Sequence, residues 1–224
     1  MLNKIILAIF LFIFNSPVEA QENEPFIGMF EYEISARDTS QQEMLSTFPM
    51  LVYTNDTITR TENFTNQLGV QVAIHHMVLN KSFLLLETAQ GKFAIKTDLN
   101  KKKIDTVLSK YTFKKKWFKR KIMGIKANRI IASHPNFEEP IEFLYLKKVS
   151  SKYNDVFDEV PGLLVRYSIA TADGVLNYEM IRMNEYSPNR GLFGIPSDFN
   201  KVSFDEFIVI VTSQNNQKVI EGGE

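Results

Sequence analysis

The side chains that could perform catalysis are few and scattered along this sequence. The chain has three histidines and no cysteine, which excludes thiolate nucleophiles, disulfides and cysteine-ligated metal centres. His75 and His76 fall in a predicted strand, where neighbouring rings point to opposite faces, so we expect no shared metal ion. His134 lies beside a proline in a predicted loop, and the acids between 155 and 159 lack the ligand spacing of a calcium loop.

The known catalytic motifs do not occur in the sequence. We find no nucleophile elbow, two-histidine metal helix, phosphate-binding loop or dinucleotide fingerprint. We therefore predict a protein that is not an enzyme, with no catalytic residue, no metal ion and no cofactor. Charge and aromatic patterning are then the features that indicate a function.

Basic residues concentrate in one segment. Between 101 and 129 there are twelve lysines and arginines and a single acid, Asp105, although the whole chain has 26 residues of each sign and a net charge of zero. Such segregation orients a molecule at an anionic surface, and interleaved aromatic rings suit a membrane interface. The alternative is a solvated pair of strands, balanced by the acids between 138 and 159. The candidate anionic-surface patch comprises Lys114, Lys115, Lys116, Trp117, Lys119, Arg120 and Lys121.

The elements that must position these residues are mostly strands. Apolar and polar residues alternate over 30–35 and 164–169, which is the period of a half-buried strand. Asn55-Asp56, Gln90-Gly91 and Asp173-Gly174 separate runs of β-prone residues and predict tight hairpins. The sequence therefore predicts a series of antiparallel strands.

Helix signals are weak and confined to 41–46 and 150–156, and we expect 207–212 to be a last strand. Sequential hairpins with few helices predict a mainly β protein built on one antiparallel sheet. A sheet of this size curls as strand twist accumulates. We expect a curved half-barrel that encloses one to three short helices around an apolar interior.

An interior of this kind could hold a lipid or another apolar ligand. Each buried CH₂ of a lipid chain would contribute about 0.8 kcal/mol. Aromatic residues on the predicted strands are the candidate lining. They are Phe30, Tyr32, Tyr53, Phe83, Phe93, Phe143, Tyr145, Tyr167 and Tyr178.

The first twenty residues predict export. Lys4 precedes an apolar run over 5–14, and Val18 and Ala20 occupy the −3 and −1 positions of a cleavage site. The run is half the length needed to span a bilayer. The predicted destination is the periplasm, or the outer-membrane or extracellular face. The predicted organisation is a signal peptide over 1–20, a single β domain over 21–213 and a flexible polar tail over 214–224.

Four segments also resemble a known family in their order and spacing. They are Gly28–Tyr32, Lys121–Lys126, Glu159–Leu164 and Phe193–Phe199. The sequence resembles the GLPGLI-type family of exported Bacteroidota proteins, related to the LolA-like lipoprotein-carrier superfamily, although Glu159 replaces the first glycine of the name-giving motif. The resemblance implies a LolA-like half-barrel and residence in the cell envelope, and it implies no activity.

Two functions therefore stay open. The first is a non-enzymatic envelope module that binds a lipid or other apolar ligand in the half-barrel. The second is a structural or interaction protein of the envelope with a protein or glycan partner. An anionic membrane surface is a further candidate partner, whereas nucleic acid is not expected, because the chain is neutral and its predicted compartment is outside the cytoplasm. The sequence does not define an oligomeric state.

Overall fold

The protein is described by a computed structural model that covers residues 25–37, 45, 48–65, 69–97, 110–157, 159–171 and 174–221, with side chains as far as residue 213. The predicted signal peptide and the first three lysines of the basic segment, Lys101, Lys102 and Lys103, lie outside these ranges. The expected helix over 41–46 is also outside them, except for Leu45, which forms a β-bridge to Thr65.

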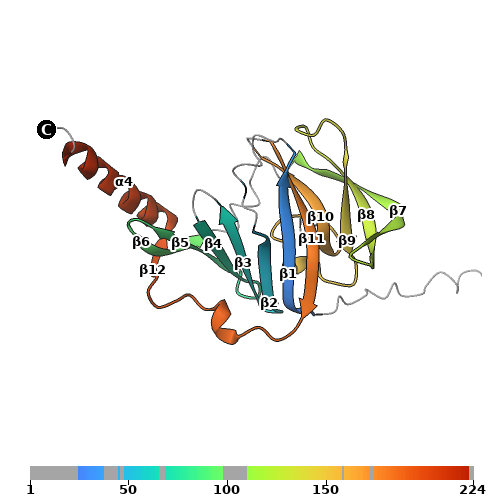
Figure 1. Cartoon of the computed structure of the whole chain (residues 1–224), viewed down its shortest axis with the longest axis horizontal. Helices are drawn as coiled ribbons and strands as arrows, with labels where there is room; N and C mark the ends of the chain where they lie inside the picture. The colour runs from blue at the N-terminus through green and yellow to red at the C-terminus, as the bar shows by residue number, and fades with distance from the viewer. Residues whose placement is uncertain are drawn as a thin grey trace, which may run out of the picture.

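Twelve strands in the described ranges form one sheet, in the order β12-β6-β5-β4-β3-β2-β1-β11-β10-β9-β8-β7 (Figure 1). All neighbours are antiparallel except β12 and β6. The strands are β1 Ile27–Ala36, β2 Met50–Asn55, β3 Ile58–Thr65, β4 Gly69–His76, β5 Lys81–Thr88, β6 Gly91–Thr97, β7 Thr112–Ile122, β8 Ile125–Ser133, β9 Ile141–Leu146, β10 Leu163–Ala170, β11 Val175–Glu185 and β12 Asn200–Ser203.

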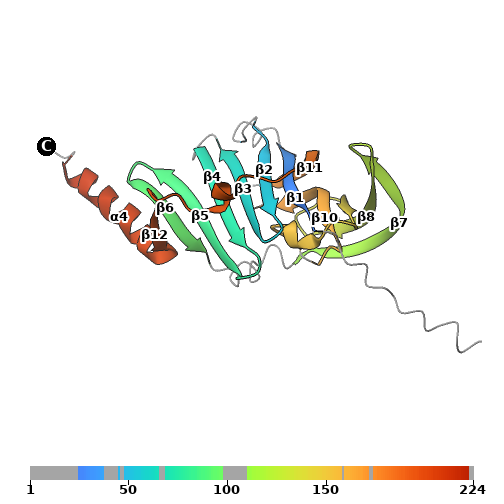
Figure 2. The same ribbon diagram turned by 90° about the horizontal axis from the view of Figure 1, so that it is seen from below.

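The predicted fold class is confirmed: the protein is mainly β, with one curved sheet that is not closed into a barrel. Figure 2 shows the sheet running from β12 beside α4 to β7, with the β7–β11 half curled. The ring of Phe157 lies within 5.5 Å of Phe113 on β7 and 6.4 Å of Tyr167 on β10. Three strand spacings separate those two strands, about 14 Å in a flat sheet, so the sheet bends around Phe157.

The hairpins predicted at Asn55-Asp56 and Gln90-Gly91 are present between β2 and β3 and between β5 and β6. Asp56 adopts a left-handed conformation with φ of 70°. The side chain of Asn55 accepts the backbone N–H groups of Thr57 and Ile58, at 3.1 and 2.8 Å. An Asn-Asp pair suits this turn because both residues tolerate positive φ and can bond the local backbone.

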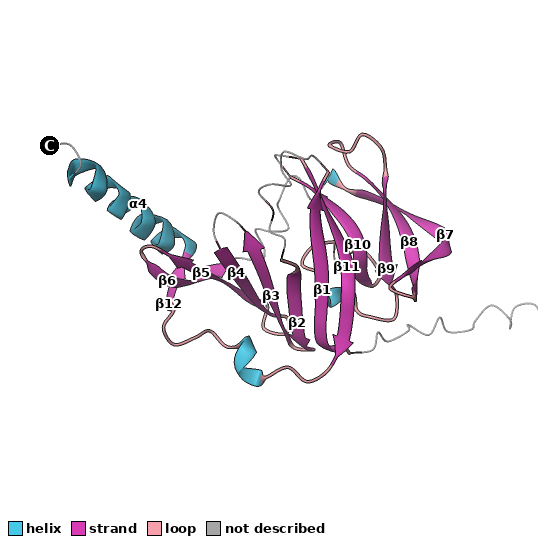
Figure 3. Cartoon of the chain, in the orientation of Figure 1, coloured by secondary structure: helices cyan, strands magenta, loops and turns pink. Residues whose placement is uncertain are grey.

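The prediction of a last strand over 207–212 is wrong, because this segment lies in the helix α4, Phe204–Glu221 (Figure 3). Ser203 and Glu206 form a capping box: the Ser203 hydroxyl accepts the Glu206 N–H, and the Glu206 carboxylate accepts the Ser203 N–H at 2.7 Å. This cap outweighs the β-branched residues that follow it. The boundary expected at residue 213 falls inside the helix.

Two short 3₁₀ helices cover opposite faces of the sheet. They are η2, Ser151–Tyr153, within the expected 150–156 segment, and η3, Arg190–Phe193. Neighbouring residues on a strand point to opposite faces. Thr61 bonds Asp155 beyond η2, whereas Arg60 bonds the Leu192 carbonyl in η3. We call the two sides the η2 face and the η3 face.

Candidate functional site

The η2 face carries the main core, and most of the predicted ligand-lining residues belong to it. Phe30 and Phe143 are completely buried, while Tyr32, Tyr145 and Tyr167 are buried to more than nine-tenths. Tyr178 is half-buried and stacks on Tyr167, with ring centroids 4.7 Å apart and planes 5° from parallel. These rings fill the interior themselves.

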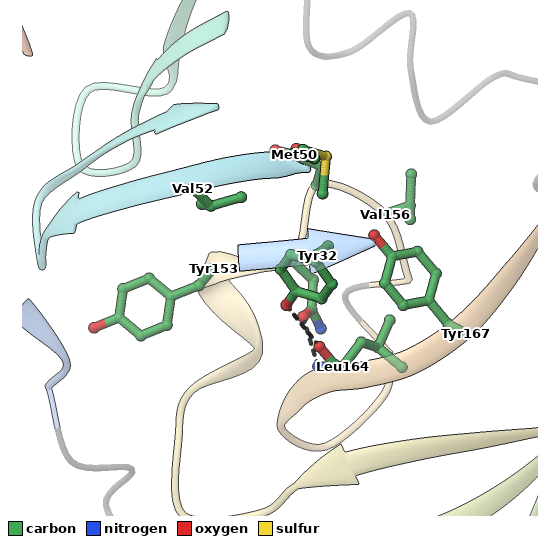
Figure 4. A pocket seen from close by; sticks show the side chains of 9 residues that line it. Tyr32, Met50, Val52, Tyr153, Val156, Leu164 and Tyr167 are labelled. Atoms are coloured by element: carbon green, nitrogen blue, oxygen red, sulfur yellow. Dashed lines mark hydrogen bonds between the residues drawn. The ribbon is translucent and has the colours of Figure 1, made fainter. Parts of the chain in front are cut away.

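Side chains from the segment between β9 and β10 complete this packing. Tyr153 of η2 lies 6.0 Å from Phe30, and Phe157 contacts Phe143 at 5.6 Å. Among these side chains lies a small pocket of about 10 Å³, lined by residues that include Tyr32, Met50 and Tyr167 (Figure 4). That is room for about one water molecule. This pocket therefore has no room for an acyl chain.

The Tyr32 hydroxyl is bonded to the backbone rather than offered to a ligand. The Tyr32 hydroxyl donates to the Leu164 carbonyl at 2.8 Å, as Figure 4 shows. Burial, followed by the charge of Asp155, raises the pKa of Tyr32 far above its ordinary value, so the phenol stays a neutral donor.

The other three predicted lining residues lie elsewhere. Tyr53 is on β2 and is half-buried. Phe93 is buried on β6 against the ring of Phe207 in α4, at 5.4 Å. Phe83, on β5, lines a separate pocket on the η3 face. The structure thus does not bring the nine residues together in one ligand site.

A second pocket lies on the η3 face, with a volume of about 240 Å³. Its floor comes from β3, β4 and β5, and one wall comes from the segment that follows β11. The apolar lining is Ile58, Ile74, Phe83, Phe193 and Ile195, and the polar lining is His76, Lys81 and Lys201.

Contacts within the wall of the pocket and between the wall and the sheet hold it in place. The Arg60 guanidinium donates to the Leu192 carbonyl at 3.1 Å. Asn189 caps η3 by accepting the Gly191 N–H at 2.9 Å. Further along the wall, Lys92 pairs with Asp198 at 3.1 Å and lies over the Phe199 ring. These bonds fix Phe193 and Ile195 over the strands.

The polar groups of the pocket are cationic or able to donate. Neither Lys81 nor Lys201 forms an ion pair within the described part of the chain. His76 accepts the Leu79 N–H through Nδ1 at 3.2 Å, so a neutral ring carries its proton on Nε2. An apolar pocket edged by these three groups suits a ligand with an anionic end.

All seven residues of the predicted anionic-surface patch lie on β7, at the opposite end of the sheet from α4. All of them are exposed, and Trp117 is 97% exposed. Arg120 alone among them has an ion pair in the described ranges, with Glu142 at 3.0 Å. The patch and the η3-face pocket are therefore separate features.

The three histidines singled out in the sequence lie on β4 and just after β8. His75 and His76 occupy successive positions of β4, so their rings point to opposite faces, as predicted. His134 is buried against Tyr111, and its Nδ1 accepts the Asn136 N–H at 3.1 Å. No group of three or more His, Asp or Glu side chains among the described residues is placed to hold a metal ion. Within the same ranges, no helix is long and apolar enough to cross a membrane.

No protein-family model matches the sequence, and no curated protein is significantly similar to it. Among solved structures, it is similar to PNGF-II in the C2 space group, with 14% identity and a TM-score of 0.47. That match covers 82% of this chain and 32% of PNGF-II. For PNGF-II in the P21 space group the identity is 14% and the TM-score 0.49, over 81% and 32% of the two chains. This chain spans about a third of the length of PNGF-II, and the resemblance to the GLPGLI-type family stays a prediction.

Proposed function

We propose that this protein is a non-enzymatic binding module that holds a small apolar ligand with an anionic end in the η3-face pocket. The observation that carries the proposal is the pocket itself: about 240 Å³, walled by aliphatic and aromatic side chains and edged by Lys81 and Lys201. An apolar cavity of about 150 Å³ already takes up benzene. The pocket is large enough for a short or branched aliphatic chain.

The site differs from the half-barrel interior that the sequence suggested. The pocket lined by Tyr32 and Tyr167 on the η2 face is about 10 Å³, so a ligand in that pocket would have to displace core side chains. On the η3 face, Phe193 and Ile195 cover strands β3 to β5 without filling the space between them. Lipid-type binding therefore remains the favoured function, with a short-chain carboxylic acid as the representative ligand.

Calorimetric titration of the purified protein with aliphatic carboxylates of increasing chain length, and with the matching alcohols, tests the proposal. We expect saturable 1:1 binding of the acids, with affinity that rises and then stops rising once the chain fills the pocket. The alcohols should bind more weakly, because they lack the charge that Lys81 and Lys201 face.

Replacing Lys81 and Lys201 by glutamine should weaken binding of the acid roughly tenfold per lysine, because bonds to charged groups contribute about 1.5–3 kcal/mol. Binding of the alcohol should hardly change. Lys148→Gln, in the exposed turn after β9, is the matched control and should leave both affinities unchanged. No saturable binding of any acid, or equal losses for acid and alcohol, would overturn the assignment and favour the structural or interaction role.

A further inference from the structure

The edge strand β7 presents an unusual surface. Nine of its eleven residues are exposed. It pairs only with β8 in the described part of the chain, so its outer edge faces solvent there. Figure 2 shows β7 at the far end of the sheet from α4. The strand thus offers both an open backbone edge and a row of side chains.

A bulge in β7 pushes two aromatic side chains outward. The pairing register jumps from Lys116↔Arg129 to Arg120↔Ala127. Three residues of β7, from Trp117 to Lys119, therefore face a single residue of β8, and a bulge of this kind re-aims the side chains it contains. Trp117 is 97% exposed and Phe118 is 80% exposed.

The start of β7, before the bulge, is anchored to the core by hydrogen bonds and aromatic packing. Tyr111, just before β7, is buried, and its hydroxyl accepts the Ala170 N–H at 2.6 Å and donates to the Ser168 carbonyl at 3.3 Å. Two residues further on, Phe113 packs on Phe143 at 5.8 Å. The aromatic pair is therefore presented by an anchored strand.

The charge around the aromatic pair is almost entirely positive. Arg120 and Arg129 both pair with Glu142, each through a different carboxylate oxygen. Within the described ranges no acid pairs with the lysines of β7. The lysines in question are Lys114, Lys115, Lys116, Lys119 and Lys121.

Protection against edge-to-edge aggregation explains only part of this surface. Lysines on an edge strand prevent pairing with other chains, and such a role requires no aromatic residue. Exposed Trp and Phe beside lysines are instead the side chains that enter the headgroup region of a bilayer, while the lysines reach anionic phosphates. We infer that the β7 edge, from Lys114 to Lys121, is a docking surface for an anionic lipid bilayer.

The chain contains a single tryptophan, so Trp117 is a built-in reporter of docking. The test uses the whole chain expressed in a Gram-negative host and purified in the form in which the host exports it, mixed with vesicles of phosphatidylcholine alone or with 30% phosphatidylglycerol. On the anionic vesicles we expect co-sedimentation, a blue shift of tryptophan emission and protection from iodide quenching. On the neutral vesicles we expect none of these.

Variants separate the charged and aromatic contributions. Lys115→Gln with Lys116→Gln should lower the partition coefficient roughly 25-fold, at about fivefold per lysine. The matched control, Lys147→Gln with Lys148→Gln in the turn after β9, removes the same charge from exposed positions and should have a much smaller effect. Phe118→Ser keeps the reporter and should weaken docking, whereas Tyr186→Ser, at another exposed aromatic, should not.

Three results would overturn the inference. The first is equal binding to neutral and anionic vesicles. The second is sedimentation with anionic vesicles while Trp117 stays fully quenched by iodide, since the ring would then lie outside the bilayer. The third is tighter binding to a soluble polyanion such as polyphosphate or a DNA oligonucleotide than to vesicles of the same total charge, which would define a polyanion site instead.

Discussion

Tyr153 joins three separate parts of the chain through one hydroxyl. The oxygen accepts the backbone N–H of Phe26 at 2.8 Å and donates to the carboxylate of Asp56. Lys152, the neighbouring residue, pairs with the same carboxylate. Burial and then the hydrogen bond to Asp56 raise the pKa of Tyr153 above its ordinary value, so the hydroxyl stays protonated.

We predict that Tyr153→Phe lowers the free energy of unfolding by about 1–3 kcal/mol, because the buried N–H of Phe26 loses its acceptor. Urea denaturation of the variant at pH 7 measures the change. Tyr186→Phe is the control, since Tyr186 is 44% exposed, and it should leave the unfolding midpoint unchanged. Equal midpoints for all three proteins would contradict the role given to this hydroxyl.

Asp56 makes stability depend on pH. Burial alone would raise the pKa of Asp56, but the hydrogen bonds from Lys152 and Tyr153 outweigh it and lower the pKa below its ordinary value. A carboxyl with a lowered folded-state pKa stabilises the protein above its unfolded-state pKa of about 4, and the contribution is lost as the pH falls through the folded-state value.

Accordingly, as the pH falls below about 4, the free energy of unfolding should decrease less in the Asp56→Asn variant than in the original protein. Asparagine suits the position because it tolerates the positive φ of this turn. Denaturation curves at pH 7 and pH 3 for both proteins provide the comparison. An unchanged pH dependence would show that Asp56 does not contribute to it.

At the scale of elements, Gly162 sets the approach of β10 to β9. Its φ is 153°, and a Cβ added there would lie 2.4 Å from the Leu146 carbonyl oxygen. Glycine is needed at this position because the backbone of the neighbouring segment leaves no room for a Cβ. Gly124, in the β7–β8 turn, has φ of 76° but open space where its Cβ would be.

This contrast gives a matched pair of variants. Gly162→Ala should cost about 2 kcal/mol or more, since both strain and overlap with backbone oppose it. Gly124→Ala meets only the backbone strain and should cost about 1 kcal/mol. Thermal and urea unfolding of both variants test the order. A larger loss for Gly124→Ala would refute the steric argument.

The elements also show where sequence reasoning succeeded and where it did not. The β2–β3 and β5–β6 hairpins could be predicted because their turns depend on local conformations of two residues. The helix α4 could have been predicted too, from Ser203 and Glu206 at capping-box spacing. The β-branched residues that follow this cap indicated a strand instead, because they favour strands when considered alone.

At the scale of the whole molecule, the two halves of the sheet have cores of different size. The larger cluster, which includes the core of the η2 face, holds 25 buried apolar residues, whereas the cluster formed by Val72, Ile74, Leu85 and Ala94 holds four, in the described part of the chain. Local opening free energies follow the apolar contacts that an opening breaks. The β4–β6 side of the sheet should therefore open before the β8–β11 side.

Hydrogen exchange measures this difference. We expect the amides of β9 and β10 to exchange only through global unfolding and those of β5 and β6 to exchange through smaller openings that depend weakly on denaturant. A saturating ligand of the η3-face pocket should slow exchange in β5, because Lys81 and Phe83 line that pocket. Uniform protection across all four strands would instead indicate a single cooperative unit.

The sequence alone determined the strand periodicity, the two-residue turns, the concentration of lysines between 101 and 129 and the absence of cysteine. These are properties of local residue types, so they do not depend on how the chain folds back. Only the tertiary structure decided how the aromatic residues of the η2 face pack together, because this packing depends on Tyr153 and Phe157 from the segment between β9 and β10. The η3-face pocket likewise exists only because the segment after β11 crosses back over β3, β4 and β5. Sequence spacing does not encode such a crossing, since it depends on contacts between residues more than one hundred positions apart, such as Arg60 and Leu192.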